Sequence, residues 1–353
     1  MAAYSTDSAG MHPSHTLPLK LQAIAATGFS QVELAFPDLE AFTAQQFPGY
    51  KVLDHMGNGG LEELCQAAQQ IRMLCDELAL QILVIHPFSN FEGYTDAKKK
   101  AQGLQRAAAW FKVMKVLGCT MLQVGSNDDP FTTDNLDEIT SDLRTLADEA
   151  AAQDPPIRIA YEMWAWGAYV NTWEDTWEVC KRVDRPNFGL CLDTFQICAR
   201  AYVDPANPTA PLSPSATSKL QESLRNLADA NLTSKIFYLQ LSDGSNKPDL
   251  QDLHQEAHKQ GIDVLYAWSN AWRPLPFMDR IEARDSDAKG YGGFLPVMDV
   301  IRAVLQTGWK GPWSYEVFYS SEMLKEEVDI PKKWTEAAQS CHKMILDQLQ
   351  SRS

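Results

Sequence analysis

The feature of this sequence that most constrains its fold is a repeated alternation between segments of helical periodicity and short apolar runs that end at a turn. Apolar residues at positions i, i+3 and i+4 indicate an amphipathic helix, whereas a short continuous apolar run indicates a buried strand. The predicted helices cover residues 17–27, 61–78, 96–117, 135–152, 171–182, 218–230, 294–307 and 331–349. The predicted strands cover residues 3–5, 31–36, 81–87, 119–124, 157–162, 188–193, 236–240 and 313–318.

This alternation predicts parallel strands joined by right-handed crossovers, because each helix returns the chain to the same end of the sheet. About eight such units in 353 residues fit a closed (β/α)8 TIM barrel better than an open, doubly wound sheet. We therefore expect an α/β protein in which residues 1–353 form a single TIM-barrel domain. Residues 204–214 are predicted to be a Pro-rich link. The segment 242–293, which follows the seventh strand, is the one long departure, and we interpret it as a lid or substrate loop.

The composition restricts the partners of this chain. Its 31 Lys and Arg residues and 46 Asp and Glu residues give a formal charge of −15, which opposes binding to nucleic acid or to an anionic membrane. No segment approaches the roughly 20 apolar residues of a membrane span, and the N-terminus lacks the pattern of a signal peptide. The seven scattered cysteines indicate buried thiols in a reducing compartment. We expect a cytoplasmic protein, and a homo-oligomer is as compatible with the sequence as a monomer.

Four polar side chains stand at or near the ends of predicted strands: Glu162, Asp193, Gln240 and Glu316. In a barrel of parallel strands, side chains at the carboxyl ends converge on one face. Three carboxylates and an amide oxygen are hard ligands, which suit Mg²⁺ or Mn²⁺ better than zinc. Any one of the four could instead pair with an arginine or cap a neighbouring helix. We interpret the four together as a metal site.

Four segments around these residues resemble the fungal 3-dehydroshikimate dehydratases, which belong to the xylose isomerase-like superfamily of divalent-metal barrels. The resemblance runs in order from Leu17 to about Gln339, and the segment around Asp193 is its most specific part. Epimerases of this superfamily often have His at the position of Gln240, whereas the dehydratases tend to have Gln. The segments are YEMWAW at 161–166, DRPNFGLCLDTF at 184–195, FYLQLSD at 237–243 and SYEVF at 314–318.

The resemblance implies a reaction, the loss of water from 3-dehydroshikimate to give protocatechuate. The substrate would be a small molecule that carries a carboxylate and a ketone. A proton leaves the carbon beside the ketone, and a divalent cation would stabilise the enolate that forms. Glu162 and Glu316 are expected to act in catalysis as well as in metal binding. Catabolism of quinate-type acids and supply of a protocatechuate-like precursor are both compatible with this reaction.

The reaction also needs a general acid or base. Bacterial relatives carry a His three residues after the second metal Asp, but this chain has Gln196 there, and an amide cannot take a proton. His86, at the end of the third predicted strand, is therefore the expected catalytic base, with a neutral core histidine as the alternative. Glu33, on the second strand, could also serve as a base or as a hydrogen-bonding prop.

Further residues are predicted to bind the substrate. Arg273 lies in the long segment after the seventh strand, and a guanidinium binds a carboxylate through two hydrogen bonds. Trp164 and Trp166 follow the Glu162 strand and are expected to form a wall for the substrate ring, with core packing as the alternative. Glu33 and Gln196 complete the predicted substrate-binding set.

The nearest alternative function is a sugar or keto-sugar isomerase or epimerase that uses the same metal site, because those reactions also begin with enolisation. A neutral sugar would not require Arg273. A second alternative is a binding module that has lost catalysis, and an abasic-site endonuclease is disfavoured by the charge. His254 and His258 have the spacing of a helical zinc pair, but Gln255 stands where a metalloprotease has Glu. We interpret that pair as a solvated face.

Overall fold

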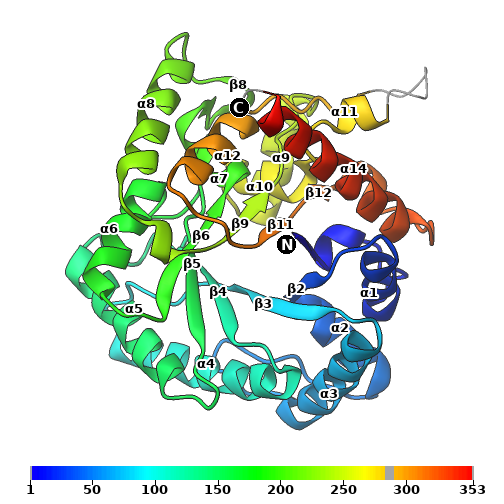
Figure 1. Cartoon of the computed structure of the whole chain (residues 1–353). Helices are drawn as coiled ribbons and strands as arrows, with labels where there is room; N and C mark the ends of the chain where they lie inside the picture. The colour runs from blue at the N-terminus through cyan, green and yellow to red at the C-terminus, as the bar shows by residue number, and fades with distance from the viewer. Residues whose placement is uncertain (1, 283–289, 352–353) are drawn as a thin grey trace.

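The computed structural model describes residues 2–282 and 290–351. In this part of the chain, eight parallel strands close into a barrel, in the order β1-β11-β9-β6-β5-β4-β3-β2 (Figure 1). The predicted (β/α)8 fold is therefore confirmed. The barrel strands are β1 Ala2–Ser5, β2 Gln31–Ala35, β3 Gln81–Phe88, β4 Met121–Gly125, β5 Arg158–Glu162, β6 Phe188–Asp193, β9 Ile236–Leu241 and β11 Trp313–Tyr315.

Helices surround the barrel, and the main ones begin and end within three residues of the predicted limits. The helix predicted to begin at Asn171 is capped instead by Thr172, which forms a reciprocal capping box with Asp175. The α4 helix ends at Gly118, whose φ of 69° is left-handed and suits glycine. These helices are α1 Leu17–Ala26, α3 Leu61–Glu77, α4 Ala97–Leu117, α5 Leu136–Ala151, α6 Trp173–Val183, α8 Ala216–Asp229, α12 Val297–Gln306 and α14 Ile330–Gln350.

Several short elements differ from the sequence-based expectation. A helix follows the second strand directly, and Pro37 occupies its first turn, where the missing N–H costs nothing. The predicted Pro-rich link contains a small antiparallel hairpin. Another helix follows β6 directly, with Asp193 as its N-cap. These additional elements are α2 Phe36–Gln46, β7 Val203–Asp204, β8 Asn207–Pro211 and α7 Thr194–Ala201, together with the 3-10 turns η1 Asp7–Ala9 and η2 Thr233–Lys235.

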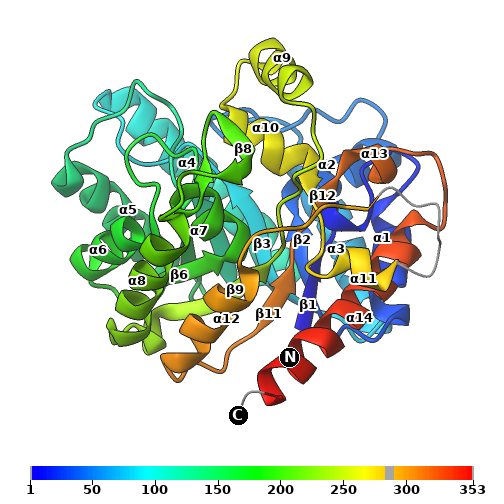
Figure 2. The ribbon, with the colours of Figure 1, turned by 90° about the horizontal axis from the view of Figure 1, so that it is seen from above.

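The segment predicted as a lid, 242–293, is described except for residues 283–289, and the described part is mostly helical. Figure 2 shows α9 and α10 at the end of the barrel opposite the chain termini. The strand β10 pairs antiparallel with β12, which comes shortly after β11, so the segment is tied to the chain beyond Glu316. Its elements are α9 Leu250–Gln260, α10 Val264–Ala271, β10 Trp272–Arg273 and α11 Met278–Ile281. The later part of the chain, with which β10 pairs, forms β12 Phe318–Tyr319 and α13 Ser320–Met323.

A small apolar cluster, separate from the core between strands and helices, includes Ala160, Cys191 and Tyr238. Each of these stands two residues before a predicted metal ligand. Since side chains alternate along a strand, the ligand and the residue two before it share a face.

All seven cysteines are free in the described part of the chain, and all but Cys65 are buried. Among the described helices, none is long and apolar enough to span a membrane.

Candidate active site

The barrel brings three of the predicted ligands into one cluster. Glu162 is the last residue of β5, Asp193 is the last residue of β6, and Glu316 follows β11. One carboxylate oxygen from each lies within 4.8 Å of the others. Gln240 pairs in register with Asp193 on one side and with Ser314 on the other. All four side chains are buried. The convergence expected from strand ends is therefore present.

Burial makes the three carboxylates costly to ionise. It raises the pKa of Glu162 well above its usual value, with further contributions from the charges of Glu316 and Asp193. It also raises the pKa of Asp193, and that of Glu316 to about 8. Carboxylates crowded in this way need a positive charge among them before all can be ionised at neutral pH. A positive charge within the cluster would lower this cost.

Arg273 supplies a positive charge inside the cluster. Its Nη1 lies 2.9 Å from Glu316 Oε2, its Nη2 pairs with Asp193 Oδ2, and its Nε donates to Ser242 Oγ at 2.6 Å. The residue is 1% exposed, and its guanidinium lies over the rings of Phe195 and Phe318. Arg273 was predicted to meet a substrate carboxylate, and in this structure it binds two predicted metal ligands.

Only one of the two carboxylate oxygens of Glu162 accepts hydrogen bonds from the described residues. Its Oε2 accepts hydrogen bonds from Gln123 Nε2 and, at 3.3 Å, from Trp164 Nε1. Its Oε1 is buried and has no hydrogen-bond partner among the described residues. Trp164 lies so close to Gly125 that a Cβ there would meet the indole ring at 2.2 Å, so glycine is required for this packing. The unpartnered oxygen leaves Glu162 with an open ligand position.

Gln240 is oriented by contacts from two other strands. Its Nε2 donates to Glu33 Oε2 at 3.1 Å, and Cys191 Sγ donates to its Oε1 at 3.2 Å. Burial raises the pKa of Glu33 to about 7. Glu33 was predicted to bind substrate, and the structure places it against a predicted metal ligand.

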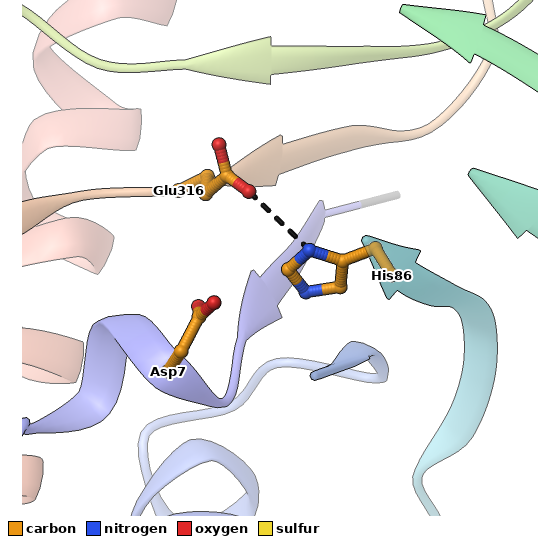
Figure 3. Close-up of side chains that lie close together, drawn as sticks. All are labelled: Asp7, His86 and Glu316. Carbon is orange, nitrogen blue, oxygen red and sulfur yellow. Dashed lines mark ion pairs between the residues drawn. The ribbon is translucent and has the colours of Figure 1, made fainter. Parts of the chain in front are cut away.

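His86 lies near the end of β3, and Figure 3 shows it beside Glu316 of the cluster. Its Nδ1 is 3.4 Å from Glu316 Oε1, and its Nε2 is 2.8 Å from Ser5 Oγ. Ser5 Oγ also lies 2.6 Å from Asp7 Oδ1 and donates its only proton to that carboxylate. The hydroxyl must therefore accept from His86 Nε2–H, which leaves the lone pair of a neutral ring on Nδ1. That lone pair faces Glu316 Oε1, so this contact requires a proton on the carboxyl group or a cation between the two atoms.

Sequence analysis missed Ser5 and Asp7, although the signal was the same one that found the metal ligands. Both stand at or just after the end of β1, and polar residues in or just after most of the other strands were assigned to the site. The first strand is short, and its few residues carry little periodicity. Applying the strand-end rule to all eight strands would have included them.

Gln196 and the tryptophans line the loop beyond β5. Gln196 Oε1 accepts from the backbone nitrogen of Ala165 at 2.8 Å, so this side chain holds the loop that carries both tryptophans. The rings of Trp164 and Trp166 have centroids 5.5 Å apart. Trp166 stacks on Tyr266 of α10 at 4.5 Å, with an interplanar angle of 2°. Tyr266, which sequence analysis did not single out, joins the lid segment to this aromatic wall.

The histidine pair on α9 lies away from this site. Both His254 and His258 are exposed, and His254 Nε2 contacts the backbone oxygen of Ala206 at 2.8 Å. The prediction of a solvated helix face is confirmed.

The residues of the cluster fit a divalent cation. Three buried carboxylates approach one another, and one of their oxygens, Glu162 Oε1, is without a partner in the described structure. Oxygen donors of this kind suit hard cations. Glu162, Asp193, Gln240 and Glu316 would hold the ion.

Comparison with known proteins agrees with this fold. The family model described as "Xylose isomerase-like TIM barrel" matches residues 21–344. The chain belongs to the xylose isomerase-like TIM-barrel family. A Neurospora crassa protein named 3-dehydroshikimate dehydratase is 33% identical to it over 90% of this chain and 86% of that protein. Within the family, the chain thus groups with the 3-dehydroshikimate dehydratases, which are hydro-lyases, and it is an enzyme of that class.

Other relatives contain more than this barrel. A Pseudomonas aeruginosa 3-dehydroshikimate dehydratase is 33% identical over 86% of this chain, which spans only 36% of that protein. A solved fusion of a xylose isomerase-like TIM barrel with a 4-hydroxyphenylpyruvate dioxygenase has a TM-score of 0.69 and 23% identity, covering 100% of this chain and 44% of that one. A solved IolI protein with a zinc atom has a TM-score of 0.65 and 15% identity, with 98% of each chain covered. These two structures show the shared fold.

Proposed function

We propose that this protein is a divalent-metal-dependent dehydratase that converts 3-dehydroshikimate to protocatechuate and water. The observation that carries the proposal is the buried cluster of Glu162, Asp193 and Glu316, whose oxygens lie within 4.8 Å of one another at the carboxyl end of the barrel. The names of the Neurospora and Pseudomonas relatives support the substrate.

The proposed cofactor is Mg²⁺ or Mn²⁺, held by Glu162, Asp193, Gln240 and Glu316. Three carboxylates and one amide oxygen are typical ligands of these ions. When bound, the cation would supply positive charge beside the ketone oxygen of the substrate, where negative charge develops during enolisation.

His86 is the proposed general base. The hydrogen bond from Nε2–H to Ser5 leaves the Nδ1 lone pair facing the cluster, which is the direction from which a substrate proton would come. Asp7 holds Ser5, and Ser5 holds the ring, so the tautomer is fixed before substrate binds. His86 would take a proton from the carbon beside the ketone. That proton and the hydroxyl group that departs leave as one water molecule, and transfer of a second proton from a ring carbon to the ketone oxygen then makes the ring aromatic.

The substrate's carboxylate is proposed to pair with Arg273, whose planar guanidinium matches a carboxylate through two hydrogen bonds. Trp164 and Trp166 would lie against the flat ring, and Tyr266 supports Trp166 from the lid segment. Gln196 acts through the backbone of the loop that carries the tryptophans. The free cysteines of the described chain support a cytoplasmic, reducing location.

The test is an ultraviolet assay with 3-dehydroshikimate, run on purified protein with added Mg²⁺ or Mn²⁺ and again with chelator. We expect an absorbance increase from the aromatic product that disappears when the metal is removed and returns when it is restored. Turnover of a keto-sugar, without any absorbance change from 3-dehydroshikimate, would favour the isomerase or epimerase alternative. Equal activity with and without chelator would exclude a metal requirement.

A further inference from the structure

Arg273 occupies the positions on Asp193 and Glu316 that a metal ion would use. We propose that Arg273 is a built-in counter-cation that a divalent metal must displace, and that this displacement frees its guanidinium for the substrate's carboxylate. The inference rests on the proposed function, since it takes the same residues as metal ligands. It adds an order of events, in which the metal binds first and thereby enables the substrate's carboxylate to bind.

Both oxygens of Asp193 are already in use. Its Oδ1 accepts from the backbone nitrogens of Phe195 at 2.6 Å and Gln196 at 3.2 Å, and its Oδ2 pairs with Arg273. Glu316 offers Oε2 to Arg273, and its Oε1 faces His86. A metal that binds Oδ2 of Asp193 and Oε2 of Glu316 therefore competes directly with the guanidinium.

Charge adds to this steric competition. A guanidinium stays protonated throughout the pH range of proteins, so Arg273 cannot leave the cluster by losing its proton. Its side chain is buried with the carboxylates, where little water screens a positive charge from a second cation. The metal and the guanidinium thus repel each other while they compete for the same oxygens.

The backbone of Arg273 is anchored, so the exchange must occur in the side chain. The β10 strand pairs with β12, the nitrogen of Ser245 donates to the oxygen of Trp272 at 2.9 Å, and the nitrogen of Asp243 donates to the oxygen of Pro274 at 2.8 Å. A displaced guanidinium therefore stays on a fixed strand beside the cluster. That position allows the same group to balance the buried carboxylates before metal binding and to receive the substrate's carboxylate afterwards.

The experiment measures Mn²⁺ binding directly, without substrate. Chelator-treated full-length protein is titrated with Mn²⁺, and free Mn²⁺ is followed by electron paramagnetic resonance. We expect Arg273→Gln to bind Mn²⁺ at least about tenfold more tightly than wild type, because it removes the competing charge. The matched control is Arg158→Gln, which removes one exposed positive charge at the start of β5, at the opposite end of the barrel, and should leave the affinity unchanged.

Ser242→Ala provides a second variant that keeps the charge. It removes only the hydroxyl that accepts from Arg273 Nε at 2.6 Å, so it should loosen the guanidinium and raise Mn²⁺ affinity about two- to fivefold. It keeps the test decisive if Arg273→Gln does not fold. Unchanged or weaker Mn²⁺ binding in the folded variants would overturn the proposal.

A second measurement tests the order of binding. Protocatechuate, the proposed product, serves as an unreactive carboxylate probe and is titrated against the wild-type protein with and without Mn²⁺. We expect binding at least about tenfold tighter with Mn²⁺, and loss of that difference in Arg273→Gln. Equal binding with and without metal would contradict the release of Arg273. If Mn²⁺ does compete with Arg273 but 3-dehydroshikimate is not converted, the exchange stands and the proposed reaction fails.

Discussion

The carboxamide nitrogen of Gln240 donates a hydrogen bond to Glu33 Oε2 at 3.1 Å, which links β9 to β2 across the barrel. A carboxyl oxygen that accepts from the amide nitrogen turns the amide oxygen away from itself. Glu33 therefore decides which atom of Gln240 is available as a metal ligand. Its buried position on the strand follows from this contact, whether or not it also touches substrate.

Replacement of Glu33 by Gln should weaken metal binding. A Gln at this position can donate as well as accept, so the orientation of the Gln240 amide is no longer fixed. We expect Mn²⁺ affinity to fall about 10- to 100-fold, as is typical when a group that orients a metal ligand is lost. The same Mn²⁺ titration measures it, with the exposed Glu62→Gln as control. An unchanged affinity would show that Gln240 is oriented by Cys191 alone.

Replacement of Glu162 by Gln should abolish metal-dependent activity while the fold persists. The variant loses a charged ligand but keeps an oxygen that can accept from Gln123 and Trp164. We expect kcat to fall at least about 100-fold. Melting of the chelated variant should occur at or above the wild-type temperature, because burial disfavours the ionised form of Glu162 and an amide does not ionise. Wild-type activity in the variant would remove Glu162 from the site.

Replacement of Ser5 by Ala should affect proton transfer but not metal binding. Without the hydroxyl, His86 Nε2–H loses its acceptor, and the ring is no longer held with Nδ1 unprotonated. We expect kcat to fall about 10- to 100-fold, a changed pH profile, and little change in KM or Mn²⁺ affinity. Ser218→Ala, at an exposed position on α8, is the control.

The number of Mn²⁺ ions bound per chain checks the role of His86. Asp7, His86 and Glu316 each offer a ligand atom within 4.8 Å of the others. One ion per chain is expected if the Nδ1 lone pair is the base. Two ions per wild-type chain, falling to one in Asp7→Asn, would assign that lone pair to a second cation.

The free energy of unfolding of the protein should fall as the pH rises through the range in which Asp243 loses its proton. Burial raises the pKa of this carboxyl to about 7, although its Oδ1 accepts from the backbone nitrogens of Gly244, Phe294 and Leu295. The unfolded chain has an Asp pKa near 3.9. Between about pH 4 and pH 7 the native state binds more protons, so the stabilising contribution is full below this window and is lost as the pH rises.

Asp243→Asn should flatten this dependence, because an amide keeps an accepting oxygen but does not titrate. We expect the slope of unfolding free energy against pH to change by on the order of 1 kcal/mol per unit. Urea unfolding of chelated protein at pH 5 and pH 7 measures the change. The exposed Asp252→Asn is the control, and a wild-type slope in Asp243→Asn would contradict the assignment.

The sequence was enough to predict the barrel and the convergence of the strand-end side chains, because both follow from local periodicity and from where a parallel strand ends. It was not enough to predict what Arg273 contacts. That contact depends on the pairing of β10 with β12, between residues that are distant in sequence. The role of Glu33 depends in the same way on the distance across a closed barrel.

Asp193 has two roles that a single substitution cannot separate. Its Oδ1 caps α7 through two backbone nitrogens, while its Oδ2 faces the cluster. A related protein that had lost catalysis would still need this aspartate, because without it the backbone nitrogens at the start of a helix packed in the core would lose their hydrogen-bond acceptor. Asp193 is therefore a poor marker of activity among related sequences. Glu162, which caps no helix and leaves one oxygen unpartnered among the described residues, is the better residue by which to recognise an active relative.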